Sequence, residues 1–156
     1  PVLQSLVAAL VLTRLDYGCT TLAGLPARQL NRLQSVLNAA ARLVYGARRS
    51  EHISPLLREL HWLRVPQRIE FRLAVLVYRC LAGTAPRYLA GELQRIADIG
   101  SRRRLRSAST TLLNVPRTTN RTIGDRAFPV AAAKVWNSLS PSTTSQTSLL
   151  AFRRAL

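Results

Sequence analysis

The chain has 156 residues, of which 47% are hydrophobic and 19% are charged. This is too apolar for a disordered basic tail, and the length suits one compact domain. Lysine and arginine number 23 against 7 acidic residues, giving a net charge of +16, and Lys134 is the only lysine. Because arginine holds phosphate in a planar fork of donors, nucleic acid is the first partner to consider. Coding by a GC-rich genome also favours arginine and alanine, and composition alone does not separate the two explanations.

The chain opens on an apolar run over residues 2–15. The run is too short and too interrupted to span a bilayer, and its spacing predicts a core helix. No basic flank precedes it and no cleavage pattern closes it before Arg14 and Asp16, so we expect neither a targeting segment nor a membrane partner. A chain that opens inside such a run is expected to be an excerpt from a larger protein.

Residues 26–45 are predicted to form an amphipathic helix, because apolar residues recur there every three or four positions. Pro26 suits the first turn of this helix, and Gly46 suits its C-terminal end. Three arginines fall together on the face that the spacing turns outward, namely Arg28, Arg32 and Arg42.

Three further helix starts are each marked by a proline in the first turn. The predicted helices run from Ser54, as N-cap, to about His61 or Trp62, from Val65 to a stop at Gly83, and from Ala85 to about Ile96. On the second of these, the arginines again lie on the outward face: Arg68, Arg72 and Arg79.

After Asp98 the helical periodicity stops, and serine, threonine, arginine and asparagine crowd residues 100–124. One or two short strands are expected there, the better candidate being an edge strand over residues 110–115. Helix returns over residues 128–139 and again from Ser148. We therefore predict a mainly α fold, in which a helical bundle at 1–98 is followed by a basic, loop-rich segment at 99–127 and a helical extension at 128–156.

Candidate catalytic groups are few. The seven acids lie singly along the chain, so no pair of carboxylates is placed to bind a metal or to share general acid and base roles, and no Gly-rich phosphate loop occurs. Cys19, Cys80, His52 and His61 have no zinc-motif spacing, and we predict that they pack in or cap the fold. Trp62 and Trp136 are both predicted to pack in the core and not to stack on bases.

The nucleic-acid signals are stronger but spread along the chain. Two runs of arginine lie in predicted loops, one at Arg48 and Arg49 and the other at Arg102, Arg103, Arg104 and Arg106. Arg117 and Arg126 add a third cluster, in which Asp125 is predicted to cap the helix that follows. Such runs bind phosphate without reading sequence. A nuclear localisation signal would have the same pattern as the second run, so an intracellular, nuclear location is also compatible with it.

Several phrases, taken in order, resemble a known family. They are RLDYG (14–18), AGLP (23–26), LQSVLNAAARLV (33–44), HISPLLRELHWL (52–63), RIEFRLAVLVYRCLAGTAPRYL (68–89), LRS (105–107), VPR (115–117), GDRAF (124–128) and KVWNSL (134–139). In number, order and spacing, they resemble the region after the polymerase domain in non-LTR, LINE-type reverse transcriptases of the jockey-like group.

The resemblance implies a helical thumb and a C-terminal extension, which follow the fingers and palm of the same polypeptide. In such polymerases the thumb grips the template-primer duplex by its backbone. The catalytic aspartates, an FADD or YADD turn, and the Mg²⁺ that they bind would belong to the palm, so no cofactor is expected in this segment. The implied partners are RNA and RNA–DNA duplex.

The sequence thus leads to one main hypothesis and one rival. The main hypothesis is a non-catalytic segment of an RNA-directed DNA polymerase that holds nucleic acid by phosphate contacts. The rival is a helical protein-interaction module, or a degenerate remnant of a retroelement reading frame, whose charge is generic.

Overall fold

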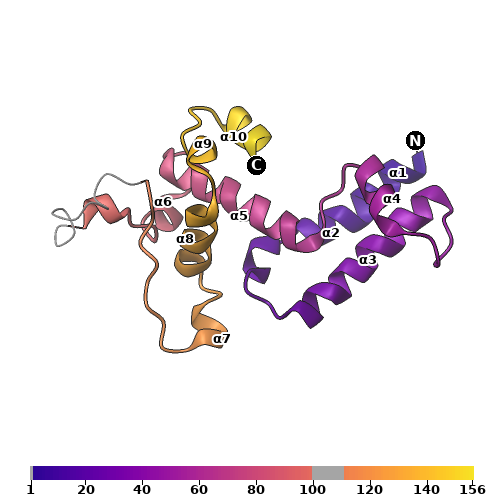
Figure 1. Cartoon of the computed structure of the whole chain (residues 1–156), viewed down its shortest axis with the longest axis horizontal. Coiled ribbons are helices and arrows are strands. Elements are labelled where there is room, and N and C mark those ends of the chain that lie inside the picture. The colour runs from indigo at the N-terminus through magenta and orange to yellow at the C-terminus, as the bar shows by residue number, and fades with distance from the viewer. Residues whose placement is uncertain (1, 100–110) are drawn as a thin grey trace. The chain divides into compact units, whose positions relative to one another are not determined.

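The computed structural model describes residues 2–99 and 111–156, and the predicted mainly α fold is confirmed (Figure 1). The chain divides into two compact units, Pro1–Ile69 and Glu70–Leu156, instead of the single domain that its length suggested. They are called unit 1 and unit 2 below. The predicted boundaries at residues 98 and 127 mark changes of composition and stay predictions.

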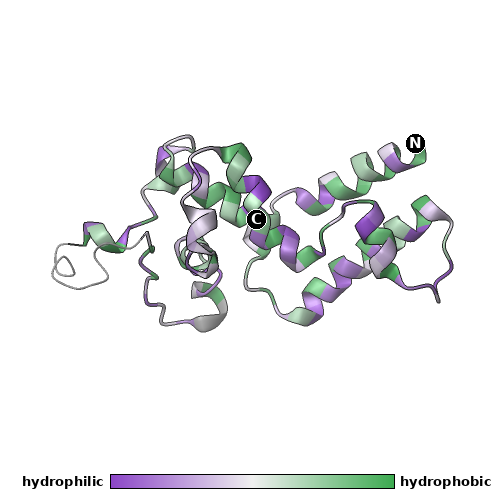
Figure 2. Cartoon of the chain, turned by 45° about the horizontal axis from the view of Figure 1, so that its top comes forward, coloured by the Kyte–Doolittle hydropathy of each residue, from purple (hydrophilic) through white to green (hydrophobic). Residues whose placement is uncertain are grey.

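Unit 1 begins with helix α1 (Val2–Val7), which continues through a π-helical turn, η1 (Ala8–Leu12), into α2 (Thr13–Asp16). The predicted helix is therefore present, but the prediction that it is a core helix is wrong. Val7 is its only buried residue, whereas Val2 is 81% and Leu10 64% exposed. Figure 2 shows how hydrophobic residues follow this helix from the N-terminus. Hydropathy identifies an apolar face, but it does not tell what covers that face.

The central helix of unit 1 is α3 (Ala27–Tyr45), which follows the predicted range closely. Its buried side is formed by Leu37, Ala40 and Ala41. Gly46 ends the helix at φ 62°, a left-handed conformation that glycine adopts without steric cost. The next helix, α4 (Ile53–Glu59), begins before the predicted cap, so Ser54 lies inside the first turn and its hydroxyl accepts a bond from Arg64 at 2.8 Å.

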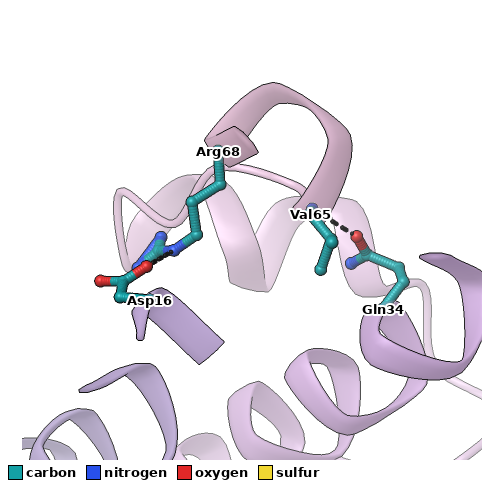
Figure 3. Close-up of polar contacts among 4 residues, drawn as sticks. All are labelled: Asp16, Gln34, Val65 and Arg68. Atoms are coloured by element: carbon teal, nitrogen blue, oxygen red, sulfur yellow. Dashed lines mark hydrogen bonds and ion pairs between the residues drawn. The ribbon is translucent and has the colours of Figure 1, made fainter. Parts of the chain in front are cut away.

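Helix α5 (Val65–Leu81) also matches its predicted range. Its first turn is joined to α3 by Gln34, whose Oε1 accepts a hydrogen bond from the Val65 N–H at 2.8 Å (Figure 3). The first N–H groups of a helix have no partner within the helix, so Gln34 supplies a cap from another element. Its amide also donates to Asn38 at 2.8 Å, which fixes the orientation of the side chain.

Unit 2 contains the rest of α5 and a set of shorter elements. They are α6 (Arg87–Ala90), the 3₁₀ turn η3 (Ile96–Asp98), α7 (Arg121–Gly124), α8 (Phe128–Ser138), α9 (Pro141–Thr144) and α10 (Leu149–Ala155). The other 3₁₀ turn, η2 (Cys19–Leu22), belongs to unit 1. The helix predicted up to Ile96 thus ends at Ala90. The two C-terminal helices are present, and Ser148 caps α10 as predicted, by accepting from the Ala151 N–H.

In place of the predicted edge strand, residues 111–115 form an isolated antiparallel bridge, in which Leu113 faces Arg95. The other edge of Leu113 is closed by Asn137 of α8, whose side-chain amide accepts from the Leu113 N–H and donates to its C=O, each at 2.9 Å. Because an amide side chain takes both of these backbone groups, no strand among the described residues pairs with this edge.

The core of unit 2 forms around Phe152 of α10, which is fully buried. Its ring stacks on Tyr78 of α5, with centroids 4.5 Å apart, and on Trp136 of α8, with centroids 5.9 Å apart. Trp136 is 4% exposed, so its predicted place in the core is confirmed, whereas Trp62 of unit 1 is only half-buried. Its indole N–H donates to the Thr111 C=O at 3.0 Å, which ties the chain before the bridge to α8.

Candidate nucleic-acid interface

Both units are strongly basic. Unit 1 holds nine arginines and three acids, a net charge of +6, and unit 2 holds fourteen basic and four acidic residues, a net charge of +10. The seven carboxylates of the chain can neutralise at most seven of its 23 basic residues. Most of the guanidinium groups must therefore be balanced by solvent ions or by an anionic partner.

Helix α3 presents the simplest basic surface. Arg28 and Arg32 are both exposed and stand four residues apart, so their side chains are neighbours on one face of the helix. The 19 residues of α3 include no aspartate or glutamate, and neither guanidinium has an ion pair within the described part of the chain. The pair can thus contact successive phosphates of a nucleic-acid strand without first breaking an internal bond.

Arg28 also lies in the first turn of α3, where the helix dipole disfavours a cation and no acid compensates it. We expect Arg28→Glu to raise the free energy of unfolding by about 0.3–1 kcal/mol, because an acid in the first turn is favourable. The same change should weaken nucleic-acid binding. Urea unfolding of this variant measures its stability, and anisotropy titration measures its nucleic-acid binding. A loss of stability would contradict the dipole argument.

A second basic group follows α3, in a turn that is built by Glu51. The Glu51 carboxylate accepts from the Arg48 N–H at 2.7 Å, and the Glu51 N–H donates back to the Arg48 C=O at 3.1 Å. These reciprocal bonds fix the backbone of the turn, while the side chains of Arg48 and Arg49 are exposed. The acid nearest to this run is thus engaged by backbone, which leaves both guanidinium groups available.

Arg42 does not share the surface of Arg28 and Arg32, although the helical spacing predicted it there. Its side chain is half-buried, and its Nη2 donates to the Glu51 C=O at 3.2 Å. Its Nε is buried without a hydrogen-bond partner in the described structure. Arg42 therefore packs between the end of α3 and the following turn, and we assign it to the structure of the turn instead of to phosphate contact.

Arg68 was also predicted to lie outward, and this prediction is wrong. Its Nε stands 2.6 Å from the Asp16 carboxylate at the end of α2, and the two side chains are only 15% and 17% exposed (Figure 3). The pair joins the start of α5 to the N-terminal helix. A phosphate could reach Arg68 only after this pair had broken.

In unit 2, the predicted contacts Arg72, Arg79, Arg117 and Arg126 are all exposed. Arg79 is partly engaged, because its Nη2 donates to the Thr84 C=O at 3.3 Å beyond the end of α5. The predicted contacts Arg102, Arg103, Arg104 and Arg106 lie outside the described residues.

Asp125 does not cap α8 as predicted. The N-cap of α8 is Ala127, with no side-chain bond, and the Asp125 carboxylate instead accepts from the Thr118 hydroxyl at 3.3 Å and pairs with Lys134 at 3.2 Å. Gly124 is needed beside it, since a Cβ there would stand 2.5 Å from the Cβ of Thr118. Through Asp125, the GDRAF segment (124–128) therefore connects the preceding loop to α8.

Histidine, cysteine and carboxylate side chains are the remaining candidate ligands in residues 2–99 and 111–156. No three His, Cys, Asp or Glu side chains of that part are grouped so that they could hold a metal ion. Cys19 and Cys80 are buried as predicted, and burial raises the pKa of the Cys80 thiol against the opposing effect of Arg79. His52 and His61 are exposed instead of packed, and His52 precedes α4 without a side-chain cap bond. None of the described helices is long and apolar enough to cross a membrane.

Sequence reasoning missed residues that act across long chain separations. Gln34 and Asn137 serve backbone groups 31 and 24 residues away, and no local pattern announces either role. Arg95 was also missed, because it lies outside every arginine run, yet it is exposed and lines a pocket of unit 2.

Searches for similar proteins, by family models, curated sequences and solved structures, found no match for this chain.

Proposed function

We propose that this chain is a nucleic-acid-binding segment that holds an RNA–DNA duplex by its phosphates, in the manner of a reverse-transcriptase thumb. The observation that carries the proposal is the exposed, acid-free arginine face of α3, extended by the Arg48 and Arg49 turn. Arg28, Arg32, Arg48 and Arg49 are called the α3 surface below. Contacts of this kind position a duplex without reading its sequence.

The length of α3 supports contact with several phosphates. Its 19 residues span about 28 Å at 1.5 Å per residue, with Arg28 in the first turn and the Arg48 turn just beyond the last. Arginine forks bind phosphate through two parallel hydrogen bonds, and the exposed side chains are free to turn toward it. The proposal is accordingly limited to binding, since it rests on arginine side chains alone.

The proposal is tested by removing Arg28 and Arg32 together, as Arg28→Gln/Arg32→Gln. The slope of log K against log salt is negative, and each lost duplex contact makes it shallower by about 0.9. We therefore expect the double variant to have a slope that is shallower by about 1.8. Fluorescence anisotropy of a labelled RNA–DNA hybrid across a salt series measures it.

The matched control is Arg153→Gln/Arg154→Gln, which removes the same charge from exposed positions on α10. Equal losses from the two double variants would mean that binding follows net charge alone, and the α3 surface would have no special role.

The apolar face of the N-terminal helix favours a second candidate function, a protein-interaction module. Leu3, Leu6 and Leu10 are 45–64% exposed and stand three and four positions apart, so they form one stripe. Exposed apolar stripes of this kind mark protein contacts. If this were the main role, Leu6→Lys would abolish partner capture and leave hybrid binding unchanged.

A further inference from the structure

Unit 2 contains a partly open pocket of about 220 Å³ beside the Phe152 core. It is lined by Tyr78 and Leu81 from the end of α5, Ala82 just beyond it, Trp136 from α8, Thr144 from α9, and Arg95 and Thr111 from the two segments that the antiparallel bridge joins. We call it the Tyr78 pocket. None of its lining residues is acidic, and Arg95 gives it one positive charge.

The walls of this pocket are held in place before any ligand binds. The Tyr78 hydroxyl donates to the Gln146 C=O at 3.1 Å, and its ring stacks on Phe152. The Trp136 N–H is likewise used internally, by the Thr111 C=O. Because the Tyr78 hydroxyl and the Trp136 N–H are both engaged internally, the two side chains contribute apolar surface instead of hydrogen bonds, and Trp136, which is 4% exposed, contributes only a small part of it. Rigid walls of this kind lower the entropic cost of binding.

Arg95 is fixed at the pocket by its backbone. Hydrogen bonds on either side of it join Ile96 to Leu112 at 3.0 Å and Asn114 to Gln94 at 2.8 Å. Its exposed side chain has no hydrogen bond or ion pair within the described residues. A guanidinium at the edge of an aromatic and aliphatic pocket suits a planar ring that carries an anionic group.

The volume limits the size of the ring. At about 220 Å³, the pocket is smaller than the 300–1,000 Å³ of typical drug-sized sites. A single heterocyclic base fits this range, whereas a whole dinucleotide cofactor does not.

From these observations we infer that the Tyr78 pocket takes one unpaired base of a single-stranded nucleic acid, with the adjoining phosphate on Arg95. The inference rests on the proposed function, and it adds a single-strand site in unit 2 to the duplex surface of unit 1. Since the polar groups of Tyr78 and Trp136 are occupied, these two residues contribute stacking and apolar contact, which tolerate any base.

The test compares two single-stranded RNA probes, a short oligoadenylate and an abasic oligomer of the same length, by anisotropy at fixed salt. The phosphates are equal in both, so only the bases differ. We expect the full chain to bind oligoadenylate about tenfold more tightly, which is the effect of one stacked base.

Two variants locate this preference. Ala82→Leu fills the pocket from an exposed position and should bring the two affinities together, whereas Ala155→Leu, an exposed alanine outside the pocket, should keep the tenfold ratio. Arg95→Gln should weaken both probes more than Arg87→Gln does, because Arg87 is exposed on α6 and does not line the pocket.

Equal affinity of the full chain for the two probes would overturn the inference, as would an undiminished ratio in Ala82→Leu. Neither result depends on the α3 surface, which is tested by the salt slope on duplex. If hybrid binding shows the expected salt slope but oligoadenylate binds no better than the abasic oligomer, only the base-binding role of the pocket is rejected. If oligoadenylate is preferred but the expected salt slope is missing, only the proposed duplex binding is rejected.

Discussion

Replacing Phe152 by alanine is expected to lower the free energy of unfolding by about 3–5 kcal/mol, the usual cost of deleting a buried aromatic ring. The site cannot collapse easily, because Tyr78 and Trp136 both stack on Phe152 and are themselves tied by hydrogen bonds. A small domain has a stability of about 5–15 kcal/mol, so this loss removes much of what holds unit 2 together.

Urea unfolding, followed by tryptophan fluorescence, would measure the effect of Phe152→Ala. Leu150→Ala is the matched control, since Leu150 belongs to the same helix and is 62% exposed. It should change the stability by less than about 0.5 kcal/mol. Similar midpoints for both variants would mean that Phe152 does not sit at the centre of the unit 2 core.

The second large effect is expected at the Asp16 and Arg68 pair. Removing one partner of a fully buried pair costs about 3–5 kcal/mol, and this pair keeps some solvent contact, so we expect a loss of about 2 kcal/mol from Asp16→Ala or from Arg68→Ala. In a double-mutant cycle the coupling energy should be at least about 1 kcal/mol. It should change little with salt, because most of both side chains is shielded from solvent.

The same variants separate structure from binding. Arg68→Ala should leave the salt slope on RNA–DNA hybrid unchanged under conditions in which the variant is folded, since Arg68 is engaged by Asp16. A coupling energy near zero, together with a shallower salt slope for Arg68→Ala, would mean that Arg68 contacts phosphate, as its helical spacing predicted.

Local signals explain what the sequence could predict. Pro26 and Gly46 bound α3, and Ser148 starts α10, because each acts through its own dihedral angles or a hydrogen bond within one turn. The helices with strong periodicity, α3, α5 and α8, accordingly match their predicted ranges. Arg28 and Arg32 were placed outward for the same reason.

What the sequence could not predict depends on partners that are distant along the chain. Arg68 meets an acid 52 residues away, and helical spacing had assigned it to the outward face. The apolar N-terminal helix was assigned to the core because hydropathy reports the composition of a face and not its neighbour. Arg42 turned inward to serve a loop whose geometry is set by Glu51.

The central claim is most directly tested by titrating the unmodified chain against a labelled RNA–DNA hybrid over a salt series, with heparin as competitor. If all four arginines of the α3 surface contact phosphates, the slope of log K against log salt should be about −3.6 or steeper. We also expect heparin, added at the same concentration of anionic groups as the hybrid, to displace the hybrid poorly. A shallow slope, or displacement by heparin as effective as by unlabelled hybrid, would contradict the duplex grip and leave a basic helical domain with generic affinity for polyanions.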